Sequence, residues 1–330
     1  MQNENFLKDV DWLSELKLRV SFGQTGNSNI GGNAYEYYEA GNQYVFGDAV
    51  QTGSIKSQLE NPDLKWETTT ELNVGLDFGF LNNRITGSFE YFHKVVSDLL
   101  AFRKLNSLME VSTIADNIGA TQSTGYEFSL NTVNLTGPFK WNTTLNISSY
   151  NDRWKERNPD VVLAPYEKED APIRAIYGCV SDGILQIGET PPASMPDLLP
   201  GQMKVKDLNG FDPNDGSKLL GHPDGKIDAA DRIYLGSTDP KVIIGFGNMF
   251  EYKNFDLNIF FYGMFGQYVA NSNRAKYGPS GCEYILQRQN YSKEVLERWT
   301  PDNPTNKFPS GFYSAYYGGD DWLLEKVSFV

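Results

Sequence analysis

An Asp- and Gly-rich stretch carries the side chains best suited to chemistry. Asp207-Leu-Asn-Gly210 is followed, after an insertion, by Asp224-Gly-Lys-Ile-Asp-Ala-Ala-Asp231. Without residues 211–223 the two pieces read D-x-N-x-D-G-x-I-D-x-x-D, close to the EF-hand or dockerin calcium pattern. The pattern predicts a structural Ca²⁺, and we expect that no other cofactor is required. The predicted metal ligands are Asp207, Asn209, Asp224, Lys226 through its backbone carbonyl, Asp228 through water, and Asp231.

A surface turn is the alternative interpretation of the same stretch. Thirteen residues separate Gly210 from Asp224, and Asp231 stands where the calcium pattern has a longer, bidentate Glu. Asp and Gly are also common in turns, where carboxylates accept hydrogen bonds from nearby backbone N–H groups. The sequence leaves both interpretations open.

Enzyme chemistry has little support elsewhere in the chain. The 42 acidic residues make carboxylate pairs inevitable at some spacing, so such pairs carry little information. His93 and His222 are the only histidines, and neither lies in an HExxH motif or beside a nucleophile elbow. Gly23-Gln-Thr-Gly26 lacks the Lys and the following helix of a phosphate-binding loop. We therefore expect no catalytic residues and no enzyme, and we place His93 at an interface.

Composition narrows the class of protein further. The chain has 330 residues, a formal charge of −13 and a pI near 4.7, so no binding of nucleic acid is expected. Aromatic residues make up 14%, which argues against a disordered acidic chain. There is no run of about 18 apolar residues, which excludes a transmembrane helix but not a transmembrane β-barrel. Cys179 and Cys282 form no metal or redox motif; a disulfide and two separate thiols both fit, with the thiols preferred.

Alternation with period 2 predicts strands, most of them paired in hairpins. Apolar and polar residues alternate over 71–80, and again over 85–91 after the turn Asn82-Asn83-Arg84. Together with similar segments elsewhere in the chain, this pattern predicts about eight strands, mostly of about 8 to 11 residues. The other predicted strands are two hairpins, 126–130 with 141–147 and 244–250 with 255–265, and two single strands, 16–22 and 322–330.

Long connections alternate with the short turns of these hairpins. The connections between hairpins cover about 24–70, 94–124, 151–241 and 267–320. Compact soluble domains rarely carry several such connections, whereas outer-membrane barrels have short periplasmic turns and long extracellular loops. The best helical candidate is short, over 292–299, where Ser292 could act as N-cap.

The two faces of each strand fit a membrane wall. One face carries Leu, Val, Ile, Phe or Trp, and the other carries Asn, Thr, Ser, Glu or Asp with some Gly. A lipid-facing exterior with a wet lumen requires this alternation, but a soluble antiparallel sheet with one solvated face gives the same pattern. The loop asymmetry and the aromatic strand ends, such as Phe139 with Trp141, favour the barrel. The predicted fold class is all-β, an antiparallel transmembrane β-barrel segment with long extracellular loops.

An ordered set of motifs resembles one family. In this order the motifs closely resemble SusC/RagA-type TonB-linked outer-membrane transporters (TonB-dependent receptors) of Gram-negative bacteria, over nearly the whole chain. The motifs are Leu16-Lys-Leu-Arg-Val-Ser-Phe-Gly-Gln-Thr-Gly-Asn27, Asn61-Pro-Asp-Leu-Lys-Trp-Glu67, Glu71-Leu-Asn-Val-Gly-Leu-Asp-Phe-Gly-Phe80, Asp116-Asn-Ile-Gly119 with Gly125-Tyr-Glu-Phe128, Asp224-Gly-Lys-Ile-Asp228, Tyr252-Lys-Asn-Phe-Asp-Leu257, and Trp299-Thr-Pro-Asp-Asn-Pro304.

The resemblance implies a part of a larger molecule. Such receptors have a barrel of about 22 strands, an N-terminal plug preceded by a TonB box, and a SusD-like surface lipoprotein over the barrel. Residues 1–330 match the C-terminal part of the barrel, about 8 of its strands. We expect the plug, the TonB box and the last strands to be absent from this chain. Related transporters carry a DxNGDGxI stretch without the insertion 211–223.

The expected function is therefore part of a nutrient importer in the cell outer membrane. The resemblance implies uptake of an oligosaccharide or a peptide. It implies a SusD-like lipoprotein, TonB through the missing N-terminal part, and outer-membrane lipid as partners. Loops 24–70, 151–241 and 267–320 are expected to set the substrate. A soluble calcium-dependent β-sandwich that binds glycans is the alternative, and a glycoside hydrolase with paired carboxylates is a third.

Overall fold

The computed structural model describes residues 4, 7, 10–29, 35–109, 111–158, 163–278, 290–311 and 320–329. The chain divides into two units, which are described separately. The first unit is Met1–Val162 with Ile244–Phe261, and the second is Leu163–Ile243 with Tyr262–Val330. None of the helices in the described ranges has the length and apolar character to cross a membrane.

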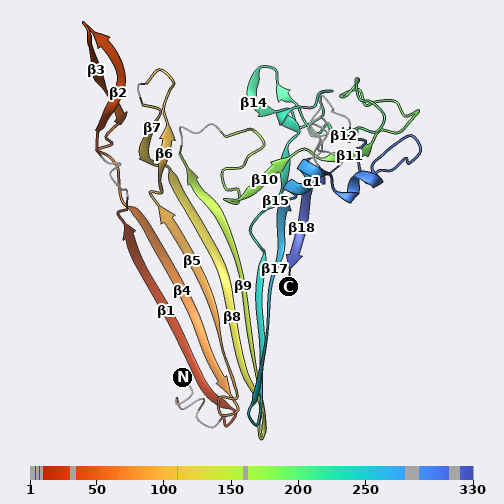
Figure 1. Cartoon of the computed structure of the whole chain (residues 1–330). Coiled ribbons are helices and arrows are strands. Elements are labelled where there is room, and N and C mark those ends of the chain that lie inside the picture. The colour runs from red at the N-terminus through yellow and green to blue at the C-terminus, as the bar shows by residue number, and fades with distance from the viewer. Residues whose placement is uncertain are drawn as a thin grey trace. The chain divides into compact units, whose positions relative to one another are not determined.

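The main element is an antiparallel sheet of eight strands in the order β1-β4-β5-β8-β9-β16-β17-β18 (Figure 1). The predicted strands and hairpins are confirmed, but seven of the eight strands have 11 to 19 residues and are longer than predicted. Polar Thr, Ser and Asn residues extend the ladders beyond the apolar runs. The bounds are β1 Leu13–Asn27, β4 Glu67–Phe80, β5 Ile85–Ser97, β8 Gly119–Thr136, β9 Phe139–Arg157, β16 Val242–Tyr252, β17 Phe255–Ala270 and β18 Leu324–Phe329.

Tight turns join β4 to β5, β8 to β9 and β16 to β17. In the first turn Leu81, Asn82 and Asn83 have φ values of 54°, 56° and 60°, a left-handed conformation that Asn adopts more readily than most residues. The guanidinium of Arg84 donates hydrogen bonds to the carbonyls of Val133 and Asn134, at 3.1 and 2.7 Å from Nη2. This side chain therefore ties the β4–β5 turn to the end of β8.

The register keeps apolar residues opposite apolar residues. Leu76 on β4 lies opposite Leu18 on β1 and Phe89 on β5. Asp77, one residue further, lies opposite Lys17 and Ser88. Because directly opposed residues share a face, the apolar side chains of β1, β4 and β5 lie on one face at these positions and the charged side chains on the other.

The long connections contain strands that the alternation of apolar and polar residues does not predict. The first connection folds as the hairpin β2 (Tyr37–Phe46) with β3 (Ala49–Gln58), and the second as β6 (Leu100–Lys104) with β7 (Thr113–Asn117). Figure 1 shows both hairpins beyond the ends of the long strands, opposite the tight turns.

The second unit is built mostly from short strands. They pair as β10 with β15, β11 with β12 and β13 with β14. The bounds are β10 Ala175–Gly178, β11 Ser181–Ile184, β12 Met203–Val205, β13 Phe211–Asp212, β14 Asp215–Leu219 and β15 Ile233–Ser237. Among the residues that the structure describes, the helical elements of this unit are α1 Ser272–Tyr277 and three 3₁₀ turns, η1 Ala229–Asp231, η3 Lys293–Glu297 and η4 Asp320–Leu323.

An apolar cluster forms the core of this unit: Cys179, Leu185, Met195, Leu198 and Val205, with Ile227 packed against it. The Cys179 side chain is buried in this cluster, whereas Cys282 lies outside the described residues.

The predicted helix over 292–299 is wrong in type and extent. Residues Lys293–Glu297 form a 3₁₀ turn, and the Ser292 side chain makes no capping hydrogen bond. The segment is too short to gain much from i→i+4 hydrogen bonds, so the tighter turn forms instead.

Candidate functional site

A network of charged side chains lies on the polar face of the first unit. Nε and Nη2 of Arg19 on β1 each lie 2.8 Å from an oxygen of Asp77 on β4, and Nη2 also donates to Glu90 on β5. Asn73 donates to the other oxygen of Glu90 at 3.4 Å. The Arg19, Asp77 and Glu90 side chains are 38%, 26% and 23% exposed. The network therefore links three adjacent strands while it stays in contact with water.

Aromatic side chains cover part of the apolar face. The ring of Phe78 lies 5.3 Å from that of Phe80 and 6.4 Å from that of Phe128, in stacked arrangements. On β1 three apolar side chains of the same face are more than half exposed; they are Leu18, Val20 and Phe22. A large exposed apolar surface of this kind marks a contact with lipid or with protein.

Polar and aromatic residues bound the apolar face at both ends. Near the tight turns, Trp141 Nε1 and Thr143 Oγ1 donate to Asn248 Oδ1 at 2.9 and 2.8 Å. Near the other end, His93 Nδ1 lies 2.8 Å from Thr124 Oγ1. Leu72 is paired with His93, and the strand from Leu72 to Phe80 is roughly 26 Å long. This length is comparable with the height of the lipid-facing band of a barrel. His93 lies at the edge of this band, and its expected place at an interface stays a prediction.

The candidate metal ligands lie in one loop network of the second unit. Asp231 is fully buried, and its Oδ1 accepts hydrogen bonds from the N–H groups of Leu208 and Asn209 at 2.7 and 3.1 Å. Its Oδ2 accepts from the N–H of Asp228 at 2.8 Å, and Asp228 in turn caps η1 by accepting from Ala230 N–H at 2.7 Å. Asp231 thus joins the two pieces of the motif through backbone groups.

The other predicted ligands bind backbone groups as well. Asp207 accepts from Asp224 N–H at 3.3 Å and from Gly225 N–H at 2.8 Å. Asp224 Oδ1 accepts from Lys226 N–H at 3.0 Å, and Asn209 Oδ1 accepts from Gly221 N–H at 2.7 Å. Side-chain oxygens that accept hydrogen bonds from nearby backbone N–H groups are the contacts that the surface-turn interpretation predicts.

The insertion is a small hairpin that returns the chain to its starting point. β13 pairs with β14, and the Leu220 N–H donates to the Gly210 carbonyl at 2.8 Å. The two halves of the motif therefore meet despite residues 211–223. Within the described ranges, no group of three or more His, Cys, Asp or Glu side chains is arranged to hold a metal ion. The calcium site stays a prediction.

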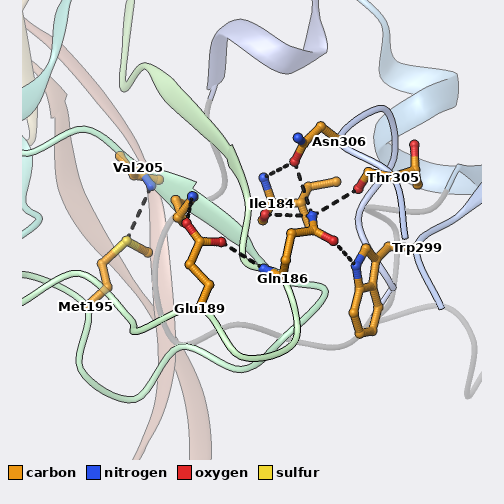
Figure 2. Close-up of polar contacts among 9 residues, drawn as sticks. Ile184, Gln186, Glu189, Met195, Val205, Trp299, Thr305 and Asn306 are labelled. Atoms are coloured by element: carbon orange, nitrogen blue, oxygen red, sulfur yellow. Dashed lines mark hydrogen bonds and ion pairs between the residues drawn. The ribbon is translucent and has the colours of Figure 1, made fainter. Parts of the chain in front are cut away.

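Trp299 anchors a second network in this unit (Figure 2). Its Nε1 donates to Gln186 Oε1 at 2.9 Å, and Gln186 Nε2 lies 3.2 Å from Asn306 Oδ1. The same oxygen of Asn306 accepts from Ile184 N–H at 3.1 Å. The Trp299-Thr-Pro-Asp-Asn-Pro304 motif therefore has a structural role here, because it holds the end of β11 in place.

The neighbouring ion pair of Glu189 with Lys204 includes a carboxylate with a lowered pKa. Hydrogen bonds from Lys204 and from the Gln186 N–H hold the pKa of Glu189 below its usual range. The Gln186 contact is 2.9 Å long. This carboxylate therefore stays ionised at a lower pH than an ordinary Glu.

A cavity of about 430 Å³ lies in the first unit, between β6 and the end of β9. It was not predicted from the sequence, and the residues that line it are Phe102, Arg103, Lys104, Ile118, Trp154, Arg157 and Asn158. A second cavity, of about 490 Å³, lies in the other unit beside α1, where Arg274 pairs with Glu294 at 3.1 Å.

The long connections also carry several tyrosines. Tyr35, Tyr37 and Tyr38 are exposed on or before β2. Tyr316 and Tyr317 lie outside the described residues.

The geometry defines a class of protein. An antiparallel sheet with one apolar and one polar face, tight turns at one end and long connections at the other is the wall of an outer-membrane β-barrel. Residues 9–193 match the model of the family described as TonB dependent receptor-like, beta-barrel. The chain belongs to this family, whose barrels lie in the outer membrane.

Curated relatives agree with this assignment. The chain is 32% identical over 356 residues to TonB-dependent receptor P3 of Formosa agariphila, a match that covers 100% of this chain and 33% of the relative. It is 33% identical over 306 residues to TonB-dependent receptor SusC of Bacteroides thetaiotaomicron, covering 90% of this chain and 30% of the relative. The chain therefore spans about a third of the length of these relatives.

A solved structure shows the same fold. The RagAB peptide transporter superimposes with a TM-score of 0.76 at 23% identity, over 98% of this chain and 34% of that chain. The predicted fold class and the resemblance to TonB-linked outer-membrane transporters are confirmed. The soluble β-sandwich alternative is wrong, because the long strands form one continuous sheet of a barrel family.

Proposed function

We propose that this chain forms part of the barrel wall and outer loops of a TonB-dependent importer for oligosaccharides or peptides. Membership of the receptor family supports this, as do a relative named SusC and a solved neighbour titled a peptide transporter. In this proposal the plug and the TonB box belong to parts of the molecule outside this chain, and a SusD-like lipoprotein covers the loop end of the barrel.

The proposal rests mainly on one observation, that neighbouring residues along a strand lie on opposite faces of the sheet, one apolar and one polar. Leu76 shares a face with Leu18 and Phe89, and Asp77 shares the other face with Arg19 and Glu90. In a closed barrel the first face contacts lipid and the second lines a wet lumen. A wall of this kind serves passage of a solute and requires no residue that makes or breaks a bond.

Deletion of the gene in its native host tests this function. We expect the protein in the outer-membrane fraction, a SusD-like lipoprotein that co-purifies with it, and slower growth of the deletion strain on one polymeric carbon or nitrogen source. Reintroduction of the wild-type gene should restore growth. Recovery of the protein from the soluble fraction, or unchanged growth and uptake on every glycan and peptide tested, would contradict the proposal.

A further inference from the structure

The cavity of about 490 Å³ beside α1 is lined by polar side chains. It lies in the second unit, where α1 follows the end of β17 that is opposite the tight turn with β16. In the proposed importer this is the end of the strands with the long outer loops. The volume is within the usual range of small-molecule sites, about 300–1,000 Å³. The described residues that line the cavity are Asn271, Asn273, Arg274, Asn290, Tyr291, Ser292 and Glu294.

The two charged side chains of this lining pair with each other. Both oxygens of Glu294 accept from the Arg274 guanidinium, at 3.1 Å from Nη2 and 3.4 Å from Nε. Arg274 Nη1 also lies 3.1 Å from Glu325 Oε1 on β18. Arg274 is therefore held between carboxylates and is not a free cation for an anionic ligand, and Glu294 already has a cationic partner. The lining favours an uncharged ligand.

Three uncharged groups of the lining have no hydrogen-bond partner among the residues that the structure describes. Two are the exposed carboxamides of Asn273 and Asn290. The third is Ser292 Oγ, which is closed off from solvent in the cavity wall. A buried hydroxyl without a partner is unfavourable, so a ligand group that pairs with it removes this cost.

We propose that this cavity binds a neutral oligosaccharide, with sugar hydroxyls paired to the carboxamides of Asn273 and Asn290 and one sugar face against the Tyr291 ring. Each carboxamide supplies an acceptor oxygen and an NH₂ donor, whereas each sugar hydroxyl both donates and accepts. Neighbouring hydroxyls can therefore satisfy both ends of a carboxamide, and the lining supplies the acceptors that hydroxyl donors need.

A peptide fits the same lining less well. Peptides are commonly recognised by addition to a sheet edge or through pockets for alternate side chains. None of the described lining residues lies on a strand, so they offer no sheet edge. Nor does the described lining contain an aliphatic side chain, and its one ring belongs to Tyr291. Apolar side chains of a peptide would find little contact here, whereas a neutral saccharide presents mostly hydroxyl groups.

The inference rests on the proposed import function, because it names a substrate class for the same molecule. Calorimetry on the complete protein purified in detergent tests it. The neutral saccharide probes are maltohexaose, cellohexaose, β-1,4-mannohexaose and xylohexaose. A galacturonate hexasaccharide and an uncharged hexapeptide of glycine and serine are the competing probes. The variants are Asn273→Ala, Asn290→Ala and the double variant. Asn214→Ala is the matched control, because Asn214 is exposed in the β13–β14 turn of the same unit.

We expect at least one of the four neutral hexasaccharides to bind. The double variant should weaken that binding by about tenfold or more, because both carboxamides and their hydrogen bonds are lost. Each single variant should weaken it less than the double variant does. Asn214→Ala should bind as the wild type does. Heat-dependent migration on gels checks that each variant is folded.

Equal binding by the double variant and the wild type would overturn the proposal. So would binding of the hexapeptide or of the galacturonate with none of the neutral saccharides, or failure of every probe at millimolar concentration. Unchanged growth of the deletion strain together with saccharide binding that depends on Asn273 and Asn290 would refute the import function alone. Impaired growth of that strain with no effect of the cavity variants on binding would refute this inference alone.

Discussion

Arg19 on β1 and Asp77 on β4 form a two-pronged ion pair, with Nε and Nη2 each 2.8 Å from a different carboxylate oxygen. Glu90 on β5 accepts from the same guanidinium, so one cation holds three adjacent strands. Both members of the pair face the lumen, where water screens the interaction. The pair therefore defines the geometry of the lumenal face more than it stabilises the barrel.

The effects of Asp77→Asn and Glu90→Gln should not be additive. Each substitution leaves the guanidinium one carboxylate, whereas the double variant leaves it none. We expect a small decrease of the unfolding temperature for each single variant and a larger decrease for the double variant than the sum. Thermal unfolding of the complete protein in detergent measures this. Strictly additive decreases would contradict the shared-cation geometry.

The close contacts around Gly87 leave no room for a larger side chain. A Cβ at this position would lie within 2.3 Å of the Ser129 carbonyl and 2.6 Å of the Phe78 ring. Gly87→Ala should therefore destabilise the barrel by about 1–3 kcal/mol through overpacking. Gly23→Ala is the matched control, because a Cβ at Gly23 meets nothing within 4 Å. Equal stability of the two variants would show that β5 and β8 are further apart than described.

Asp231 organises the acidic loop from within. Asp231→Asn keeps the shape but replaces one acceptor oxygen by an NH₂ group, so at least one backbone N–H loses its partner. We expect a local destabilisation of about 1–3 kcal/mol, seen as faster hydrogen exchange at Leu208 or Asp228. The exposed Asp182→Asn should have no such effect. Measurement with and without Ca²⁺ also tests the predicted metal site, since bound calcium should slow exchange across 207–231.

The Glu189–Lys204 pair predicts a pH dependence. The folded-state pKa of Glu189 is lowered from its ordinary value of 4.5, so its contribution to stability is present above that value and is lost as the pH falls through the lower folded-state pKa. Hydrogen exchange of the 184–189 segment should accelerate in that acidic window. In Glu189→Gln the same segment should show less change with pH. An unchanged pH profile in this variant would contradict the assignment.

The sequence predicts the long strands well where alternation is uninterrupted, as over Leu72 to Phe80. It misses β2 and β3 because the register shifts between Ala40 and Gln43, and this bulge breaks the period of two. It misses β6 because five residues are too few for a periodic signal.

The sites depend on pairing between distant segments. Arg19 and Asp77 are both visible as charges in alternating strands, but only the register of β1 with β4 brings them together. Phe102 and Trp154 meet at one cavity because β6 follows β5 and Trp154 lies near the end of β9, and no local spacing encodes that meeting. The acidic motif is visible in the sequence, whereas its hydrogen bonds to backbone groups depend on the fold of the insertion.

The central claim is that neighbouring residues of one strand face lipid and lumen in turn, and spin labels test it most directly. Nitroxides are attached at Leu76→Cys and Asp77→Cys in the complete protein reconstituted into a bilayer, with the native cysteines replaced by Ser. The account predicts that the label at 76 collides with oxygen dissolved in lipid and is shielded from an aqueous nickel chelate. The label at 77 should show the reverse. Equal access of the chelate to both labels, or the opposite assignment, would contradict the barrel wall described for this chain.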